Sequence, residues 1–344
     1  MPANCVLSLS KKDAEVANSL LIADKIHGVA VKHIKLCGAL PPWIRTEYVL
    51  NERYIYQVSN CTVYPLSGAV VLNETAGRGE KVLVESIGSL LKTMTFSDLK
   101  TESVRPRSRN HRVGHVVPLA GGRGGHYHWL LESLPGAIRC HERCRDAPFL
   151  VSSERAGYVD QSLALLFGDS FSVVSVPDGA AVECDKVTFY SKSYGAANFH
   201  PDDVMLVRTK LLDACSLRPR NNIERKIYIS RRLAANRKCD ETSVEEFFVR
   251  KGYDVVFPET LTFVDQIQLF SEASHIAGLH GAGLANILFA PEGARVVELF
   301  RGDYLNDCYA RLASTLGYSY GFQVSRDASR LAFDWSTLEQ IIES

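Results

Sequence analysis

One stretch near the C-terminal end constrains the fold of this chain most strongly. Residues 274–300 read SHIAGLHGAGLANILFAPEGARVVELF, which predicts a buried strand, a glycine turn, a helix, a second turn and a second buried strand. A glycine turn that opens a helix presents unpaired backbone N–H groups and the positive end of the helix dipole. The pattern therefore predicts an α/β unit with an anion site, suited to a phosphate, at this turn.

Five residues of this stretch are candidates for binding a nucleotide or phosphate. His280 ends the first strand, Gly281 permits a tight turn, and Gly283 lets a ligand approach the backbone. Asn286 follows in the first turn of the helix, and Glu298 closes the second strand, where a carboxylate can accept hydrogen bonds from ribose hydroxyls. The alternative is that the glycines only permit close packing of the helix on the sheet.

Related anion-binding motifs fit this turn less well. A dinucleotide-binding turn reads G-x-G-x-x-G, whereas Asn286 stands at the third glycine and His280 precedes the first. A P-loop needs G-x-x-x-x-G-K-[ST], which the sequence lacks. A nicotinamide-dependent oxidoreductase stays open as an alternative, because a strand, G-x-G, a helix and a later acid are also its pattern.

Arginines follow an earlier predicted strand of the same half. Residues 226–238 read KIYISRRLAANRK, which places Arg231, Arg232 and Arg237 after the strand, at the carboxyl edge where open α/β sheets bind ligands. Guanidinium groups pair with phosphate through two hydrogen bonds and stay charged. Arg231 and Arg237 are therefore predicted to neutralise a diphosphate; solvated surface arginines are the alternative.

A second candidate site lies in the first half, in GGRGGHYHWLLESLPG, residues 121–136. The predicted helix places His128 and Glu132 four residues apart, hence on one face. A carboxylate that binds one ring nitrogen orients an imidazole, so that the other nitrogen can take a proton. This is a general-base arrangement. His126 points to another part of the helix, and an isolated structural histidine is the alternative for His128.

The order of elements predicts an α/β fold with a β-rich N-terminal portion. The first 44 residues read as helical and then loop-like, residues 45–90 as short strands, and residues 100–112 as a solvated basic loop. From residue 115 strands and helices alternate, and beyond residue 225 five strands do so regularly. We expect two Rossmann-like domains facing a cleft, with domains at 1–216 and 217–344.

Composition and charge exclude some classes of function. Lys plus Arg equals Asp plus Glu at 39 each, so net charge gives no reason to expect nucleic-acid binding. The sequence has no run of about 18 uncharged apolar residues and no signal-peptide pattern. Nine scattered cysteines suit free thiols, which predicts a cytoplasmic protein. Cys140 and Cys144 lack a second pair, so we expect no metal site.

These motifs together resemble glycosyltransferase family 61, which includes bacterial capsular polysaccharide enzymes and eukaryotic sugar transferases. The resemblance rests on HYHWLLESLP, on YISR with Arg237 and the following Asp240 and Glu241, and on HGAGLANILFAPEGARVVELF. It covers about residues 115 to 300. The chain departs from the family pattern at Asp240, where related sequences often have Asn, and at Gly136, where a basic residue is common.

The resemblance implies a GT-B fold and an inverting transfer from a nucleotide sugar, usually a UDP-sugar, to a hydroxyl of a glycan or polysaccharide. The first domain would bind the acceptor, and lipid-linked glycans are among the possible acceptors. The second domain would bind the nucleotide sugar. No Asp-x-Asp motif occurs, so we expect no metal and no cofactor besides the donor. The expected location is the cytoplasm, including a peripheral position at the inner face of the membrane.

In this interpretation the glycine turn and the arginines hold the donor diphosphate and stabilise its charge as it leaves. His128, oriented by Glu132, would deprotonate the acceptor hydroxyl. A non-catalytic nucleotide- or glycan-binding module is a further alternative.

Overall fold

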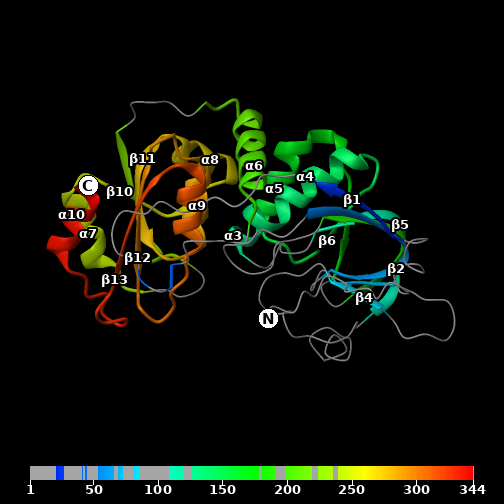
Figure 1. Ribbon diagram of the computed structural model, residues 1–344, viewed down its shortest axis with the longest axis horizontal. Helices are drawn as coiled ribbons and strands as arrows, with labels where there is room; N and C mark the ends of the chain where they lie inside the picture. The colour runs from blue at the N-terminus through cyan, green and yellow to red at the C-terminus, as the bar shows by residue number, and fades with distance from the viewer. Residues whose placement is uncertain are drawn as a thin grey trace. The chain divides into compact units, whose positions relative to one another are not determined.

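A computed structural model describes residues 21–26, 41, 43–44, 53–65, 69–72, 81–84, 108–119, 125–177, 180–190, 199–218, 224–234 and 239–343. The chain divides into two compact units. The N-terminal unit comprises Met1–Val29 and Leu50–Asp203, and the C-terminal unit comprises Ala30–Val49 and Val204–Ser344. Each unit contains a sheet and helices, so the protein is a mixed α/β protein (Figure 1).

The described strands of the N-terminal unit form one mixed sheet of eight strands in the order β4-β3-β2-β8-β5-β6-β7, with β1 paired to β2. Pairs among β1 to β4 and between β2 and β8 are antiparallel, whereas β8, β5, β6 and β7 are mutually parallel. The strands are β1 (Leu21–Ile26), β2 (Arg53–Tyr64), β3 (Ala69–Leu72), β4 (Lys81–Val84), β5 (Ser108–Pro118), β6 (Phe149–Ser152), β7 (Val173–Val176) and β8 (Ala180–Tyr190).

Helical segments connect the parallel strands of this unit. Three consecutive segments lie between β5 and β6: α3 (His126–His128), the π-helical segment η2 (Trp129–Ser133) and α4 (Leu134–Arg143). The helix α5 (Gly157–Phe167) and the short 3-10 helix η3 (Gly168–Ser170) lie between β6 and β7. The region around η2 thus begins just beyond the carboxyl end of β5.

The C-terminal unit contains a five-stranded parallel sheet in the order β10-β9-β11-β12-β13. Its strands are β9 (Arg225–Ile229), β10 (Asp254–Val256), β11 (Ala273–Leu279), β12 (Arg295–Phe300) and β13 (Ser319–Val324). Its helices are α7 (Thr242–Arg250), η4 (Pro258–Thr260), α8 (Phe263–Ser271), the 3-10 helix η5 (Ala282–Phe289), α9 (Cys308–Leu316) and α10 (Trp335–Glu343). Near-continuous apolar strands such as RVVELF are typical of a parallel sheet covered on both faces.

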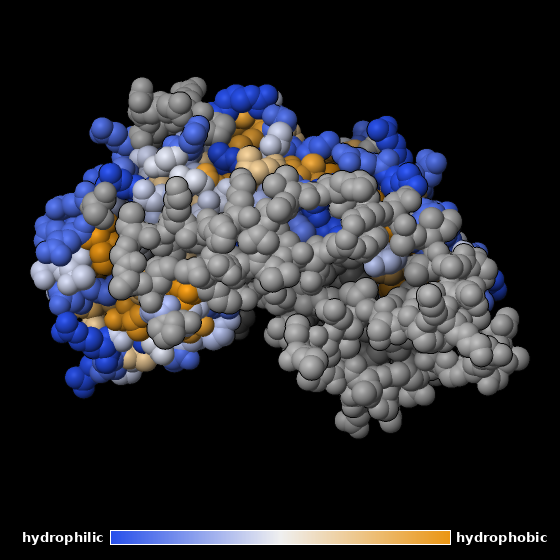
Figure 2. Space-filling model, viewed as in Figure 1, coloured by the Kyte–Doolittle hydropathy of each residue, from blue (hydrophilic) through white to orange (hydrophobic). Residues whose placement is uncertain are grey.

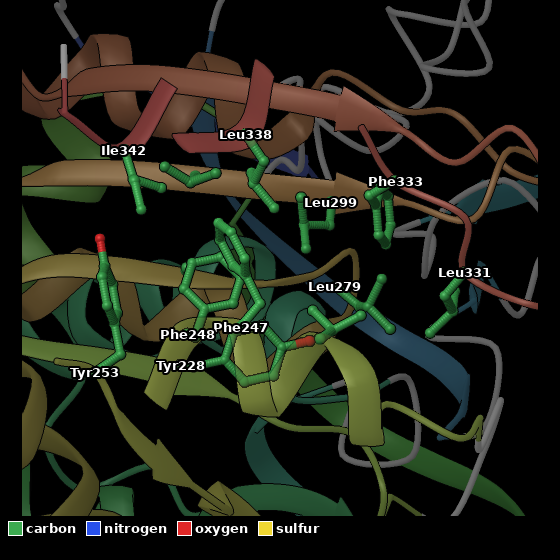
Figure 3. Packing of buried hydrophobic residues seen from close by; sticks show 13 residues of the cluster. Tyr228, Phe247, Phe248, Tyr253, Leu279, Leu299, Leu331, Phe333, Leu338 and Ile342 are labelled. Carbon is green, nitrogen blue, oxygen red and sulfur yellow. The ribbon is translucent and has the colours of Figure 1, made fainter. Parts of the chain in front are cut away.

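Two layers of helices cover this sheet. On one face, aromatic residues of α7 and leucine and isoleucine of α10 pack on alternate residues of β9, β11 and β12 (Figure 3). Helices α8 and α9 lie on the opposite side of the sheet from α7 and α10 (Figure 1). The burial of both faces leaves the ends of the strands as the place where this sheet can meet a ligand.

The strand order gives this sheet a topological switch point. The chain leaves β9 toward β10 on one side and leaves β11 toward β12 on the other. Open α/β sheets bind ligands outside the carboxyl ends of the two strands where the order reverses. The switch point lies between β9 and β11, and the predicted residues Arg231 and His280 follow these two strands.

Most strands and helices beyond residue 115 are where the sequence predicts them, and the mixed α/β class is confirmed. Two local predictions were wrong. Leu21–Ile26 is a strand paired to β2 instead of a helix, and Ser108 to Arg112 belong to β5 instead of a loop. The first sheet is mixed, so the N-terminal unit is Rossmann-like only across its four parallel strands. In each case pairing between distant strands determines the structure, and local sequence does not report it.

The boundary between the units lies within α6 (Pro201–Ala214), at Asp203 and Val204, instead of at residue 216. The reason is that α6 is held by the C-terminal unit: Arg208 donates hydrogen bonds to the backbone carbonyls of Leu288 and Ala290. Part of the N-terminal sequence also belongs to this unit, because the ring of Trp43 packs edge-on against Phe300, with centroids 4.9 Å apart.

On the face shown in Figure 2, the coloured residues are mostly hydrophilic, with apolar areas between them. The exposed large apolar side chains of the described residues are distributed over several elements; they are Met205, Leu233, Val249, Val264, Tyr304, Leu305 and Trp335. Within the described ranges no helix combines the length and the hydropathy required to cross a bilayer.

Candidate functional site

The first candidate site lies where the helix after β5 changes its winding. The backbone N–H of Leu134 bonds to the carbonyl of Trp129, five residues earlier, which makes Trp129–Ser133 a π-helical turn. Pro135 follows directly and has no N–H to donate to the preceding turn, which favours a local change of helix type. The predicted break near Pro135 is therefore a π-turn. Such turns occur frequently at functional sites.

The π-turn keeps His128 and Glu132 adjacent. Nδ1 of His128 lies 2.9 Å from Oε2 of Glu132, and the two side chains are 31% and 7% exposed. Neither Nδ1 nor the other carboxylate oxygen, Oε1, has a hydrogen-bond partner among the described residues. The contact thus has the distance of an ion pair without the direction of a hydrogen bond. The two side chains lie within reach of each other, and the orientation of the imidazole by Glu132 stays a prediction.

The neighbours of this pair form the buried side of the segment. Trp129, Leu130 and Leu131 are buried as predicted, and Nε1 of Trp129 donates a 2.8 Å hydrogen bond to Ser162 of α5. The structure also explains one departure from the family pattern. A methyl group at Gly136 would lie 3.3 Å from Cβ of Tyr190, so a larger residue fits there only if β8 or the tyrosine shifts.

The second candidate site is the carboxyl edge of the C-terminal sheet, where Arg231 and His280 meet. Nη1 of Arg231 donates a hydrogen bond to the backbone carbonyl of His280, which joins the ends of β9 and β11. The backbone N–H of Arg231 donates to Oε1 of Glu241 over 2.7 Å, and the Tyr228 hydroxyl donates to Oε2 over 2.6 Å. Burial raises the pKa of the Glu241 carboxyl. Glu241 fixes the backbone from which Arg231 extends.

Gly281 makes room for this arginine. Its φ is 173°, an extended backbone that any residue adopts, so no special conformation requires glycine. A methyl group here would lie 2.8 Å from Cζ and Nη1 of Arg231, well inside van der Waals contact. The Tyr309 hydroxyl donates a 2.7 Å hydrogen bond to the Gly281 carbonyl. Glycine lets the guanidinium lie against the backbone, and with a methyl group here the end of the Arg231 side chain would have to shift.

Gly283 and Asn286 have structural neighbours in place of the predicted open edge. A methyl group at Gly283 would lie 3.2 Å from Cγ2 of Ile229, so this glycine allows η5 to pack on the end of β9. Asn286 is fully buried, and its Nδ2 donates to Oε1 of Gln266 over 2.8 Å. The segment after the turn is a 3-10 helix whose residues from Leu284 to Phe289 are all buried. Donor binding by Gly283 and Asn286 stays a prediction.

Glu298 faces His280 and lies inside the protein. Its side chain is completely buried, and Oε1 forms a hydrogen bond with Nδ1 of His280. Its other oxygen, Oε2, accepts a 2.5 Å hydrogen bond from the Tyr320 hydroxyl. Burial and the nearby carboxylate raise the pKa of Tyr320 well above its ordinary value. Both carboxylate oxygens therefore have protein partners, and ribose binding by Glu298 stays a prediction.

A second arginine at this edge was missed from the sequence. Arg301 directly follows β12, as Arg231 and His280 follow β9 and β11. Its Nη2 lies 3.4 Å from Asp303, and its side chain is 28% exposed. Its buried Nε has no hydrogen-bond partner in the described part of the chain. The signal available in the sequence was its place directly after RVVELF, at the carboxyl end of a predicted parallel strand.

The remaining predicted arginines differ in place. Arg232 is half exposed, pairs with Glu245 at 3.3 Å and lies over the ring of Phe257, which leaves it a surface role. Arg237 falls outside the described residues. The structure thus groups Arg231, His280, Gly281 and Glu298 in the C-terminal unit, and it holds His128 with Glu132 in the N-terminal unit.

No group of three or more His, Cys, Asp or Glu side chains in the described residues is placed to hold a metal ion. Cys140 and Cys144 lie one turn apart in and after α4, and the Cys144 thiol donates to the Cys140 carbonyl.

Comparison with known proteins matches a region that begins in the first site and ends within the second. A family model described as Glycosyltransferase 61 matches residues 126–297, which is half of the 344-residue chain. The match begins at the α3 segment of the first site and ends one residue before Glu298 in the second. The chain belongs to glycosyltransferase family 61, as the sequence motifs predicted.

Curated relatives match over shorter segments. The chain is 33% identical over 103 residues to the EGF domain-specific O-linked N-acetylglucosamine transferase of Drosophila melanogaster, which covers 29% of this chain and 20% of that protein. It is 41% identical over 61 residues to the protein of the same name from Bos taurus, 17% of this chain and 11% of that one. It is 52% identical over 42 residues to the human protein O-linked-mannose beta-1,4-N-acetylglucosaminyltransferase 2, 12% of this chain and 7% of that one. These segments span a fifth or less of each relative.

Proposed function

We propose that this protein is a glycosyltransferase that moves a sugar from a nucleotide-diphosphate sugar, a UDP-sugar, to a hydroxyl of a glycan or polysaccharide. The observation that carries the proposal is the convergence of Arg231, His280 and Arg301 at the carboxyl edge of one parallel sheet, in a member of family 61. Adjacent strands lie about 4.8 Å apart, so three neighbouring strands spread these three residues across roughly 10 Å. That spacing suits a diphosphate, which can bind two cations at once.

The proposed chemistry divides between the two sites. As the bond between sugar and phosphate breaks, negative charge grows on the nucleoside diphosphate, and fixed cations stabilise it. Arg231 is held for this role by Glu241 and by the His280 carbonyl. His128, with Glu132 beside it, takes the proton of the acceptor hydroxyl as it attacks the anomeric carbon. One such direct displacement inverts the configuration at that carbon.

Several finer points belong to the same proposal. The family resemblance supports a GT-B arrangement, a reaction without a metal ion or another cofactor, and a glycan acceptor that includes lipid-linked ones. The names of the curated relatives contain N-acetylglucosamine, which makes UDP-N-acetylglucosamine the first donor to test. A role in capsular polysaccharide synthesis and a cytoplasmic location stay predictions. Family membership removes the basis for the oxidoreductase alternative.

A donor screen tests the proposal without knowledge of the acceptor. A ligand that binds only the folded state raises the melting temperature by mass action, so thermal shift is measured with free UDP and a panel of nucleotide sugars. We expect at least one nucleotide sugar and UDP to stabilise the protein. Stabilisation by NADH with none by any nucleotide sugar would contradict the proposal.

Turnover then tests the assignment of the base. His128→Ala should lower the rate of sugar transfer while leaving the affinity for UDP unchanged, because His128 is proposed to act on the acceptor. His111→Ala, on β5, is a matched control that removes a histidine outside both sites. Full transfer activity of His128→Ala would remove His128 from the mechanism. Binding of donor and glycan without any turnover in the parent protein would favour a non-catalytic module.

A further inference from the structure

We infer that Glu298 and Tyr320 are positioning residues that hold the His280 ring so that its Nε2 faces the diphosphate of the donor. The inference rests on the proposed function, since it takes a diphosphate as the ligand. It replaces the ribose contact that the sequence suggested for Glu298 with a role through His280. Tyr320 had no role in the sequence-based interpretation.

The hydrogen bonds give each member of this group a defined part. Tyr320 keeps its proton, since its pKa is raised, and donates it to Oε2 of Glu298. The other oxygen, Oε1, is left to accept a hydrogen bond from Nδ1–H of His280. Because Nδ1 carries this hydrogen, the orientation of the ring is fixed and Nε2 is the atom directed away from the carboxylate.

The contacts around the His280 ring leave Nε2 as the ring nitrogen that can reach a ligand. The His280 ring stacks on Phe300 with centroids 5.2 Å apart and contacts Tyr304 and Tyr309 at 5.3 and 5.5 Å. The side chain is 13% exposed, and no described residue forms a hydrogen bond with Nε2. The other titratable or charged groups of the elements packed around the ring are Arg231, Arg301, Asp303, Asp307, Cys308 and Arg311.

Charge explains why such a ring suits a diphosphate. A buried carboxylate needs charged or hydrogen-bonding partners, and the His280 ring supplies a hydrogen bond to Glu298. With the proton present on both nitrogens, Nε2–H can donate to a phosphate oxygen while Nδ1–H stays on Glu298. Arg231 and Arg301 end the strands on either side of β11. The proton remains on the ring when the nucleoside diphosphate leaves, so no step consumes it.

The two His–Glu pairs of the protein differ in their hydrogen bonding. His280 and Glu298 share a hydrogen bond inside the C-terminal unit, whereas His128 and Glu132 are close without one. A pair that is already bonded and buried is suited to hold the ring in one orientation beside an anion. A pair without a fixed bond, with a third of the ring exposed, is suited to exchange a proton with an acceptor hydroxyl.

Nuclear magnetic resonance of the histidine ring nitrogens tests the inference directly, with inorganic pyrophosphate and UDP as probes. Addition of either probe to the protein should move the Nε2 resonance of His280 and leave Nδ1 bound to Glu298. Glu298→Gln should weaken UDP binding about tenfold, the size expected for one charged hydrogen bond. Probe binding with an unchanged Nε2 resonance would overturn the inference, and so would no response to either probe.

Two conservative variants distinguish positioning from simple structural support. Tyr320→Phe removes the hydrogen bond from the tyrosine to Glu298, so the carboxylate interacts more strongly with the His280 ring. The midpoint of the pH dependence of UDP affinity should then move to higher pH. Glu298→Gln removes the negative charge beside the ring, so the midpoint should move to lower pH. UDP itself titrates in the same way with every variant, so its contribution cancels when the midpoints are compared. Tyr318→Phe is the matched control, because its hydroxyl binds the Ala290 carbonyl outside this group.

Shifts of equal sign in the two variants, or none, would overturn the positioning role. The outcomes also separate this inference from the proposed function. If pyrophosphate moves the Nε2 resonance of His280 but the protein has no activity on any nucleotide sugar, the positioning of His280 stands and the transferase proposal is refuted. Sugar transfer without any effect of the probes on His280 does the reverse.

Discussion

Gly281→Ala tests whether the glycine turn exists to accommodate Arg231. The added methyl group would lie 2.8 Å from Cζ of the arginine, whereas ordinary carbon contacts begin near 3.5 Å. The extended backbone at Gly281 accepts alanine without strain, so any effect comes from this contact. The guanidinium must move away and break its hydrogen bond to the His280 carbonyl. A hydrogen bond from a charged group contributes about 1.5–3 kcal/mol.

We therefore expect Gly281→Ala to cost about 1–3 kcal/mol, which allows for partial relaxation of the flexible arginine. Denaturant unfolding measures the effect on stability, and calorimetric titration with UDP measures the effect on affinity. The same substitution in an Arg231→Ala background should cost less than about 0.5 kcal/mol, because the clashing group is gone. Gly157→Ala, whose methyl group would meet only Gln161 at 3.7 Å, is the control.

A double-mutant cycle makes the result decisive. The two substitutions should be non-additive by at least about 1 kcal/mol. If their effects add, the guanidinium does not lie against Gly281, and the glycine must be explained by a ligand or by another conformation.

Three further predictions concern other parts of the two sites. Arg301→Met should weaken UDP binding by about tenfold in calorimetry with little change in melting temperature; unchanged affinity would exclude Arg301 from the donor site. Gly136→Arg introduces a basic residue typical of the family and should destabilise the protein by about 1–3 kcal/mol, because Tyr190 lies 3.3 Å from the first added atom. An unchanged free energy of unfolding in urea would show that β8 shifts to make room. Hydrogen bonds from Thr242 lower the pKa of Asp240, so the stabilisation by this carboxylate is present above the ordinary value of 3.8 and is lost as the pH falls below it. Asp240→Ala should therefore reduce the free energy of unfolding at pH 7 and have a smaller effect at pH 3. An equal effect at both pH values would refute the assignment.

The C-terminal sheet could be predicted because its signals are local. Each strand is a short apolar run bounded by turn residues, and α7 and α8 repeat apolar residues with helical spacing. The relation of Arg231 to His280 followed from their positions after parallel strands, whose carboxyl ends share one edge. Strand β1 and the start of β5 could not be predicted, because partners distant in sequence determine them.

The roles of single side chains depended on three-dimensional contacts. The sequence places Glu298 at the end of a strand, but only packing shows that both its oxygens are taken by His280 and Tyr320. Likewise, the spacing of Gly281 and Gly283 reveals a tight turn without saying whether ligand or protein fills the space. Arg301 was overlooked because a single arginine after a strand has no motif around it.

The central claim is that the carboxyl edge of the C-terminal sheet binds the diphosphate of a sugar donor that the protein uses. The most direct measurement is the initial rate of UDP release from a panel of UDP-sugars, beginning with UDP-N-acetylglucosamine, with and without a pool of glycan acceptors. We predict acceptor-dependent release from at least one donor, reduced about tenfold or more in Arg231→Ala. No acceptor-dependent release from any donor, or an unchanged rate in Arg231→Ala, would contradict the claim.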